Sequence, residues 1–442
     1  MSAFDEAPTD SCSITSLPLE ILSQIFADYL ALVPEEQQRA RIALSTVCKL
    51  WRTASEVETA FNVNDGATAS RLLAELQQRS ATSVRSLGVK WSERAPMLNT
   101  SGLTPSNVSD RLAESTSLAE QARETSKVQA AALLNLCAGT LVALDLGLVE
   151  HNTGPVQLQG LSGSPIDSRI VQALKNLDNL QSCRLQVLNP GRLNLSEGDM
   201  LALLRSWTNL QRLNLADMHV YELRPLRPPP PGAAFQASTT PAPSTALPAL
   251  RHLTMSINSL PRFSFVPFNL LKSLLLSSAH SLRTLHIPRI YSSLNRLLLL
   301  EALTPLAPQL VDFECTDVRQ EELSTYLDQL VPLLTSARHL KIGPLGFSQS
   351  TIFQSLRDGL PLLQSCTIDV RDLDLVIPVE AIGAFLDEAG VGAGHGRRLE
   401  KLVFVQKMET AYITWSEEEK RVIAYRGRRA GVEVVWDRKK YM

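Results

Sequence analysis

A six-residue pattern recurs through most of the chain and constrains its fold more than any other feature. Apolar residues occupy the first, fourth and sixth positions of each copy, as in LQRLNL at 210–215. The last two apolar positions alternate as they do in a β-strand that buries one face. Each copy therefore predicts a short strand, and GVEVVW (431–436) predicts a closing one. The copies are VRSLGV (84–89), LVALDL (141–146), LQSCRL (180–185), LQRLNL (210–215), LRHLTM (250–255), LRTLHI (282–287), LVDFEC (310–315), ARHLKI (337–342), LQSCTI (363–368) and LEKLVF (399–404).

Many copies follow an amphipathic, helix-like stretch, such as FNLLKSLLLSSAH (268–280) before the strand at 282–287. One helix and one strand per unit is typical of long leucine-rich repeats, whose units bury their apolar faces only by stacking. We therefore predict an α/β fold, a leucine-rich-repeat-like solenoid with short parallel strands inside and helices outside. The alternative is a doubly wound sheet, whose strands are longer apolar runs because helices cover both faces.

Two stretches interrupt the repeats. Residues 92–125 are rich in Ser, Thr, Asn, Glu and Ala, and residues 223–248 are rich in proline. Neither stretch has enough apolar residues to offset the entropy cost of ordering, so both are predicted to be flexible insertions. The second contains Pro225, Pro228 and Pro231 at the spacing of a polyproline II ligand, although a plain insertion is the simpler interpretation.

The N-terminal region predicts a separate helical module. LPLEILSQIFADYL (17–30) places apolar residues at helical spacing, and IALSTVCKLWRTA (42–54) does the same. We assign residues 14–60 to this module, after a disordered tail at 1–13, and residues 61–442 to the repeats. A module of this size buries little surface alone, so it either packs on the rest of the chain or presents an apolar face to a partner.

These two blocks resemble the F-box family, whose pattern is LPxE[IL]hxxIhxxL (h, apolar) and, after a variable gap, VC[KR]xW. The match covers about a tenth of the chain. It implies binding to the Skp linker subunit of a cullin–RING ubiquitin ligase. The alternative is a helical cap that closes the end of the repeats. The residues expected to contact the Skp linker are Leu17, Pro18, Ile21, Leu22, Ile25, Phe26, Leu44, Val47, Cys48 and Trp51.

Composition and motifs argue against several other classes of protein. The formal net charge of −2 gives no general attraction to nucleic acid or acidic lipid, and no apolar run approaches the ~20 residues of a membrane span. The N-terminus lacks a secretory signal, so we expect an intracellular protein in the cytoplasm, the nucleus or both. The six cysteines form no CxxC pair, and Cys183, Cys315 and Cys366 are predicted to be core residues.

The sequence contains no recognisable catalytic or cofactor motif. HExxH and GxSxG are absent, and the glycine-rich GVGAGHG (390–396) follows a helix-like run, the reverse of a nucleotide-binding fingerprint. We therefore predict no enzyme activity, no cofactor and no metal. The basic residues between Lys420 and Lys440 are interpreted as a solvated last helix and strand cap, with a docking patch for an acidic partner as the alternative.

The predicted function is that of a target receptor in a ubiquitin ligase of the SCF type. The F-box would bind the Skp linker and, through it, a cullin, while the repeats hold an unknown target protein. One rival is a Skp-binding scaffold that recruits no ligase, and another is a regulator of a GTPase, which needs a catalytic Arg or Asn at the rim. The predicted target contacts are Arg212, Asn214, His252, Thr254, His286, Arg338 and Lys341.

Overall fold

The computed structural model describes residues of both the predicted F-box and the repeats. They are Pro18, Ile21, Leu22, Ile25, Ser117, Gln121 and Leu247, and the ranges 59–78, 84–92, 124–149, 167–186, 194–217, 219–221, 249–255, 257–258, 268–291, 296–318, 326–343, 352–370, 377–389, 399–407 and 415–439.

The core of the molecule is a twelve-stranded sheet in which every neighbouring pair of strands is parallel and the strand order follows the chain. Each copy of the six-residue pattern supplies one strand, so the predicted α/β class with parallel strands is confirmed. The strands are β1 (Thr59–Val63), β2 (Val84–Ser92), β3 (Ala143–Val149), β4 (Ser182–Gln186), β6 (Arg212–Asp217), β8 (His252–Met255), β10 (Thr284–His286), β12 (Asp312–Cys315), β14 (His339–Ile342), β15 (Ser365–Asp369), β16 (Lys401–Lys407) and β17 (Glu433–Lys439).

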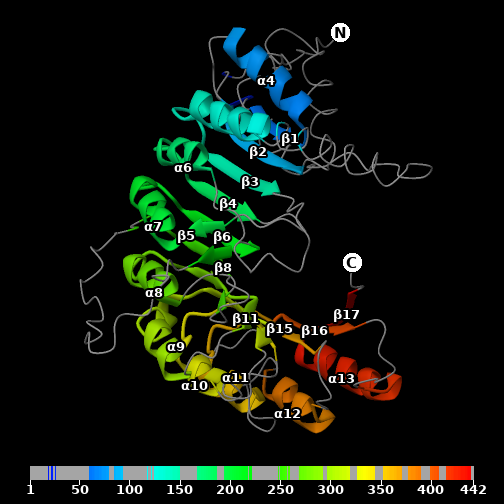
Figure 1. Cartoon of the computed structure of the whole chain (residues 1–442). Coiled ribbons are helices and arrows are strands. Elements are labelled where there is room, and N and C mark those ends of the chain that lie inside the picture. Colours follow the sequence, from blue (N-terminus) through cyan, green and yellow to red (C-terminus); the bar gives the residue numbers. More distant parts are fainter. Residues whose placement is uncertain are drawn as a thin grey trace, which may run out of the picture.

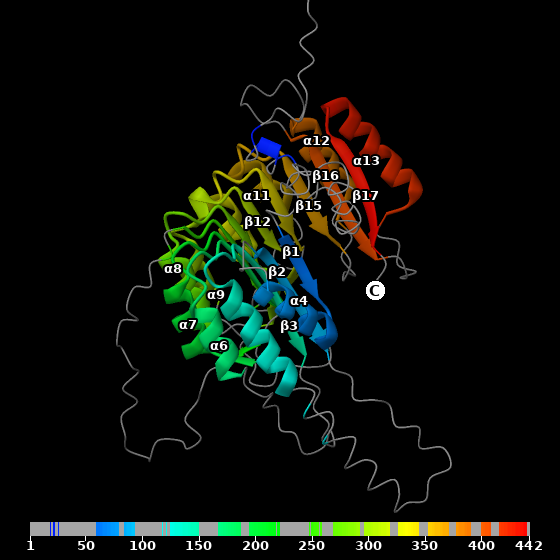
Figure 2. The same ribbon diagram turned by 90° about the horizontal axis from the view of Figure 1, so that it is seen from above.

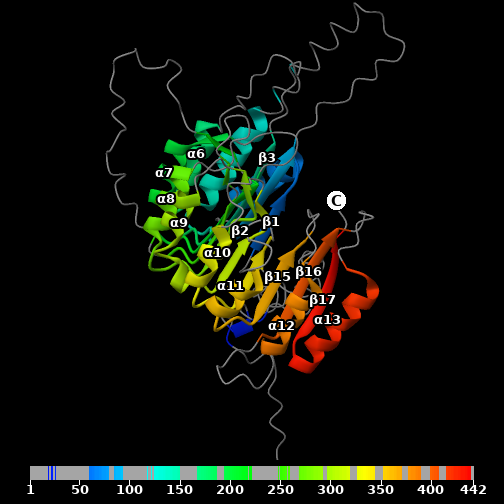
Figure 3. The same ribbon diagram turned by 90° about the horizontal axis from the view of Figure 1, so that it is seen from below.

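The helices connect successive strands and lie on the outside of the curved sheet, and together they form an arc (Figures 1 and 3). The view from above also shows α6 to α9 on the outer side of the strands (Figure 2). A doubly wound sheet would reverse its strand order, and this sheet does not. One helix covers residues 124–137. The others are α4 (Gly66–Gln78), α6 (Ser168–Lys175), α7 (Glu197–Ser206), α8 (Phe268–Ser277), α9 (Arg296–Leu303), α10 (Tyr326–Leu330), α11 (Ile352–Gly359), α12 (Val379–Ala389) and α13 (Glu417–Ala430). Two short 3-10 helices, η2 (Ala307–Gln309) and η4 (Val331–Leu333), complete the set that the structure describes.

Two small parallel sheets lie beyond the main strands. One joins β5 and β7, and the other joins β9, β11 and β13. The strands of the second sheet directly follow β8, β10 and β12 in the chain. Three successive repeats therefore stay paired in parallel beyond the end of the main sheet. The strands are β5 (Asn194–Ser196), β7 (His219–Tyr221), β9 (Ile257–Asn258), β11 (Arg289–Tyr291) and β13 (Asp317–Val318).

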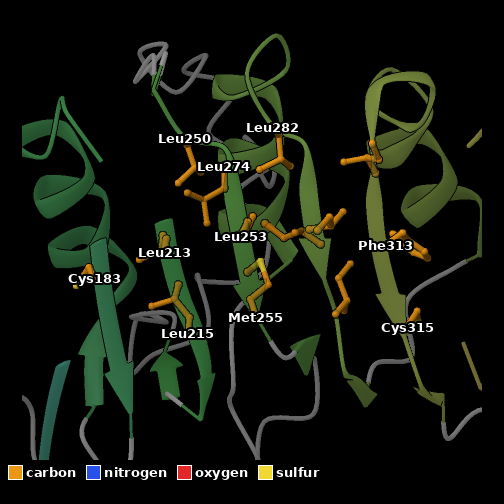
Figure 4. Close-up of a cluster of buried hydrophobic side chains, with 14 of the residues drawn as sticks. Cys183, Leu213, Leu215, Leu250, Leu253, Met255, Leu274, Leu282, Phe313 and Cys315 are labelled. Atoms are coloured by element: carbon orange, nitrogen blue, oxygen red, sulfur yellow. The ribbon is translucent and has the colours of Figure 1, made fainter. Parts of the chain in front are cut away.

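The apolar positions of the six-residue pattern form the core. Their side chains point toward the helices, as Figure 4 shows for the middle repeats. The fourth positions stack from strand to strand, and all of these side chains are buried: Leu87, Leu144, Cys183, Leu213, Leu253, Leu285, Phe313, Leu340, Cys366 and Leu402. Cys183 and Cys366 are buried in this row, and Cys315 is buried at the sixth position of its copy. Their predicted core role is therefore confirmed. Burial raises the pKa of the Cys366 thiol to about 12, so this thiol stays uncharged.

The C-terminal end of the sheet is closed by α13 and an aromatic cluster. The rings of Phe404 and Trp436 stack with centroids 4.8 Å apart, and Trp415 meets both edge-on. The indole N–H of Trp415 donates to the Ile377 carbonyl at 3.0 Å. Lys420 was predicted to be solvated, but only 8% of it is exposed, with its ammonium 5.8 Å from the Trp436 ring centroid. Its stem therefore covers the cluster, and its charge meets the ring face.

The ends of α13 are fixed by local sequence. Ser416 and Glu419 form a capping box at the N-terminus, in which each side chain accepts from the other residue's backbone N–H. Gly431 ends the helix at φ 73°, a left-handed conformation that glycine adopts without a Cβ penalty. Three glutamates in the first turn and two arginines in the last complement the helix dipole.

The sheet begins close to the predicted boundary between the helical module and the repeats. β1 begins at Thr59 and pairs with β2, so the sheet starts just inside the range predicted for the helical module. Residues 93–116 and 222–246, which make up most of the two predicted insertions, lie outside the described residues. Ser117, Gln121 and residues 124–125 were included in the first insertion, but all of them are helical, and the helix at 124–125 continues to 137. Among the helices that the structure describes, none combines the length and the apolar character needed to cross a lipid bilayer.

Candidate binding surfaces

The inner face of the sheet is formed by the third and fifth positions of the six-residue pattern. Successive side chains of a strand point to opposite faces, so these positions face away from the core and the helices. Strand pairing aligns the third positions as one row: Ser86, Ala143, Ser182, Arg212, His252, Thr284, Asp312, His339, Ser365, Lys401 and, on β17, Glu433. The fifth positions form the second row: Gly88, Asp145, Arg184, Asn214, Thr254, His286, Glu314, Lys341, Thr367, Val403 and Val435.

Six of the seven predicted target contacts lie in these two rows. They are Arg212, Asn214, His252, Thr254, His286 and Lys341. Arg338 lies outside the rows, one residue before β14, and is exposed where that strand begins. His339 occupies the equivalent inner-face position. Assigning the third and fifth positions of every copy to the inner face would also have placed Asp312 and Glu314 there.

Three neighbouring strands carry an ion-pair ladder, which consists of His286, Asp312, Glu314 and Lys341. His286 Nε2 lies 3.1 Å from Asp312 Oδ2, and its Nδ1 lies 3.7 Å from Glu314 Oε2. Lys341 Nζ donates to Glu314 Oε1 at 2.6 Å. Burial alone would lower the pKa of His286, but the hydrogen bond to Asp312 and the two carboxylate charges raise it overall. The ladder thus places a basic side chain beside each of the two acids at the centre of the face.

The neighbouring strands β6, β8 and β10 carry an excess of positive charge. Arg212 and His252 are adjacent in the first row, and Arg251 and Arg283 are exposed where β8 and β10 begin. We call Arg212, Arg251, His252 and Arg283 the basic patch. Partial burial and then the positive charge of Arg212 lower the pKa of His252, and the charges of His286 and Arg251 add to this effect against the opposing charge of Asp312.

The described carboxylates elsewhere on the inner face also have partners. Asp145 forms an ion pair with Lys90 and accepts a hydrogen bond from the Gln186 amide at 2.7 Å. Near the C-terminal end, Lys401 Nζ lies 3.2 Å from Glu433 Oε2. The inner face is therefore a polar surface whose acids are largely compensated by its own cations.

The described part of the predicted F-box is a helical turn with an exposed apolar edge. The amides of Ile21 and Leu22 both donate to the Pro18 carbonyl at 3.1 Å, so a helical turn follows this proline. Ile21 and Ile25 are 49% and 41% exposed, and their spacing of four places them on one face. Leu22 was predicted to lie with them, but it is fully buried, so in this structure it anchors the turn instead.

The remaining predicted Skp contacts lie outside the described residues. They are Leu17, Phe26, Leu44, Val47, Cys48 and Trp51. Within the described part of the chain, no group of three or more His, Cys, Asp or Glu residues is placed to hold a metal ion. No protein-family model matches this chain, and no curated protein matches its sequence.

Proposed function

We propose that this chain is an F-box protein with a leucine-rich-repeat solenoid, and that it acts as the target receptor of a cullin–RING ubiquitin ligase. The observation that supports the docking role is the pair Ile21 and Ile25, large apolar side chains that stay half exposed beside the fully buried Leu22. A helical turn that only capped the repeats would gain by burying both, since each buried isoleucine contributes about 1.5–3 kcal/mol. Their exposure is suited to a partner surface.

The repeat architecture supports the second half of the proposal. A solenoid needs units that contact mainly their sequence neighbours, and the strand order of the sheet follows the chain from β1 to β17. Such a stack presents one continuous inner face, here two rows of mostly polar side chains across the sheet. That face is suited to holding a protein segment and offers no arrangement of nucleophile, base and oxyanion donors.

The proposed mechanism is proximity. The F-box attaches the chain to the Skp linker, and the inner face holds the target, so that a target lysine stays near the ubiquitin-charged enzyme. Holding two reactants together replaces an encounter between free molecules by a reaction at high effective concentration. The chain itself then forms and breaks no covalent bond.

Binding of the Skp linker subunit to the full chain tests the proposal. Ile21→Asp with Ile25→Asp places two charges on the exposed edge, and Leu276→Asp, at a leucine of α8 that is 57% exposed, is the matched control. We expect the double variant to bind at least about 30-fold more weakly, which corresponds to two contacts of about 1 kcal/mol each, and the control to bind like wild type. Equal binding by all three proteins would refute the docking role.

A second measurement separates a ligase receptor from a scaffold that binds the Skp linker alone. Purification of the tagged chain from cells should recover a cullin together with the linker. The Ile21→Asp, Ile25→Asp variant should lose both proteins. Recovery of the linker without any cullin would favour the scaffold instead.

A further inference from the structure

The basic patch combines two inner-face residues, Arg212 and His252, with two exposed residues at the edge where β8 and β10 begin, Arg251 and Arg283. It differs from the rest of the inner face because its arginines form no ion pair with the acids that the structure describes. In the ion-pair ladder each carboxylate meets a cation, and Asp145 meets Lys90. Arg212 and Arg251, by contrast, form no ion pair with any residue that the structure describes. Arg283 donates to the neutral Gln309 Oε1 at 2.8 Å, and it too forms no ion pair within the described part of the chain.

The charges of the basic patch are spread along a line instead of converging on one point. Arg212 and His252 are register neighbours on β6 and β8, and the Arg283 amide donates to the Arg251 carbonyl across β8 and β10. Adjacent strands lie about 4.8 Å apart, so the patch extends roughly 10 Å across the strands. An extended peptide rises about 3.4 Å per residue, so three or four residues cover this distance.

The surroundings of His252 also contain more cations than anions. Burial is the largest cause that lowers the pKa of His252. The charges of Arg212 on β6, His286 on β10 and the adjacent Arg251 lower it further, and Asp312 on β12 opposes them. A bound anion would reverse this effect and favour the protonated imidazole.

We propose that the basic patch binds an acidic segment of a target protein, in which several aspartate or glutamate side chains lie within three to five consecutive residues. This deepens the receptor function and rests on it. Carboxylates spaced along a peptide can each meet one cation of the patch, and charge-assisted hydrogen bonds to arginine are the stronger kind. A single phosphate group would instead need donors that converge on one position.

Fluorescence anisotropy with a labelled peptide, Gly-Glu-Asp-Glu-Glu-Asp-Gly, tests the proposal on the full chain. Arg212→Gln with Arg251→Gln removes two charges from the patch. Arg421→Gln with Arg429→Gln removes two charges from exposed positions of α13 and is the matched control. We expect the patch variant to bind the peptide at least about tenfold more weakly and the control to bind like wild type. Binding should also weaken as salt is raised, because exposed charges are screened.

Three results would overturn the proposal. The first is no saturable binding of the acidic peptide by wild type, and the second is an equal loss in both variants. The third is tighter binding of a glycine–serine peptide carrying one phosphoserine, which would assign the patch to phosphate. Circular dichroism and thermal unfolding of each variant show that the fold is retained, as expected for exposed arginines.

The pH dependence provides a readout that a merely structural role would not give. Wild type should bind the acidic peptide more tightly at pH 5.5 than at pH 7.5, because a bound carboxylate favours the protonated form of His252, and His252→Gln should reduce the difference. This assay contains no Skp subunit. Loss of peptide binding with intact Skp binding would therefore remove the acidic-target inference alone, while the reverse result would remove the docking role alone.

Discussion

Leu253→Ala should destabilise the chain by about 3–5 kcal/mol. Leu253 is fully buried on β8, between Leu213 of β6 and Leu285 of β10 in the same row of the core. The substitution removes three buried carbons, which at about 0.8 kcal/mol each gives about 2.4 kcal/mol. The cavity left behind adds to this, because the neighbouring strands are held by their own pairings and collapse only partly into it.

Leu276→Ala is the matched control for this prediction. It deletes the same atoms from a leucine of α8 that is 57% exposed, and leucine and alanine are both good helix formers. We expect its effect to stay within about 0.5 kcal/mol. Leu253→Met, which keeps the side-chain volume, should cost less than about 1.5 kcal/mol.

Urea unfolding followed by circular dichroism measures these differences as shifts of the transition midpoint. Because each repeat contacts mainly its neighbours, the transition should also be inspected for loss of cooperativity, which would show that the defect divides the stack. Equal destabilisation by Leu253→Ala and Leu276→Ala would refute the assignment of the fourth pattern position to the core.

Two further predictions concern backbone approach and pH. In Gly343→Ala the new Cβ would overlap the Thr316 carbonyl oxygen, so we expect the free energy of unfolding to fall by more than about 1 kcal/mol in urea unfolding. Gly139→Ala meets nothing within 4 Å and should be neutral or stabilising. For His286 the folded-state pKa is raised, so its stabilisation is fully present below the unfolded pKa near 6.5 and is lost as pH rises through the folded value. Wild type should therefore exceed His286→Gln in stability most at pH 5.5, with the gap narrowing by pH 8.5, and a constant gap would contradict the ion-pair ladder. His252, whose pKa is lowered, should show the opposite trend.

The apolar pattern was sufficient to locate the strands because it reports a physical requirement of each strand separately. Leu213 and Leu215 must face the helices, so Arg212 and Asn214 face the other way, and one strand's sequence contains this information. At ARHLKI the pattern is weaker. Arg338 and His339 are both polar, so polarity alone does not show which of them lies on the inner face. The first strand, TAFNV, was missed because its single alternation of Phe61 and Val63 is too short to stand out.

The interactions between strands were not predictable in the same way. His286, Asp312 and Glu314 lie up to 28 residues apart in the sequence, and their contact depends on the lateral register of β10 and β12. That register is set by how the apolar rows stack, which involves every repeat at once. The burial of Leu22 beside the exposed Ile21 is of the same kind, because it depends on which side of the helical turn the rest of the chain covers.

The separation of core rows from inner-face rows also explains how the charge of the inner face can change while the core is kept. Positions four and six of the pattern are fixed by packing, and a change such as Leu253→Ala affects the whole stack. Positions three and five carry little packing load, so Arg212 or Thr254 can change with effects near those of ordinary surface substitutions. Charge on the inner face can therefore vary strand by strand while the fold stays constant. The basic patch on β6 to β10, beside the ion-pair ladder on β10 to β14, is an arrangement that such independent variation can produce.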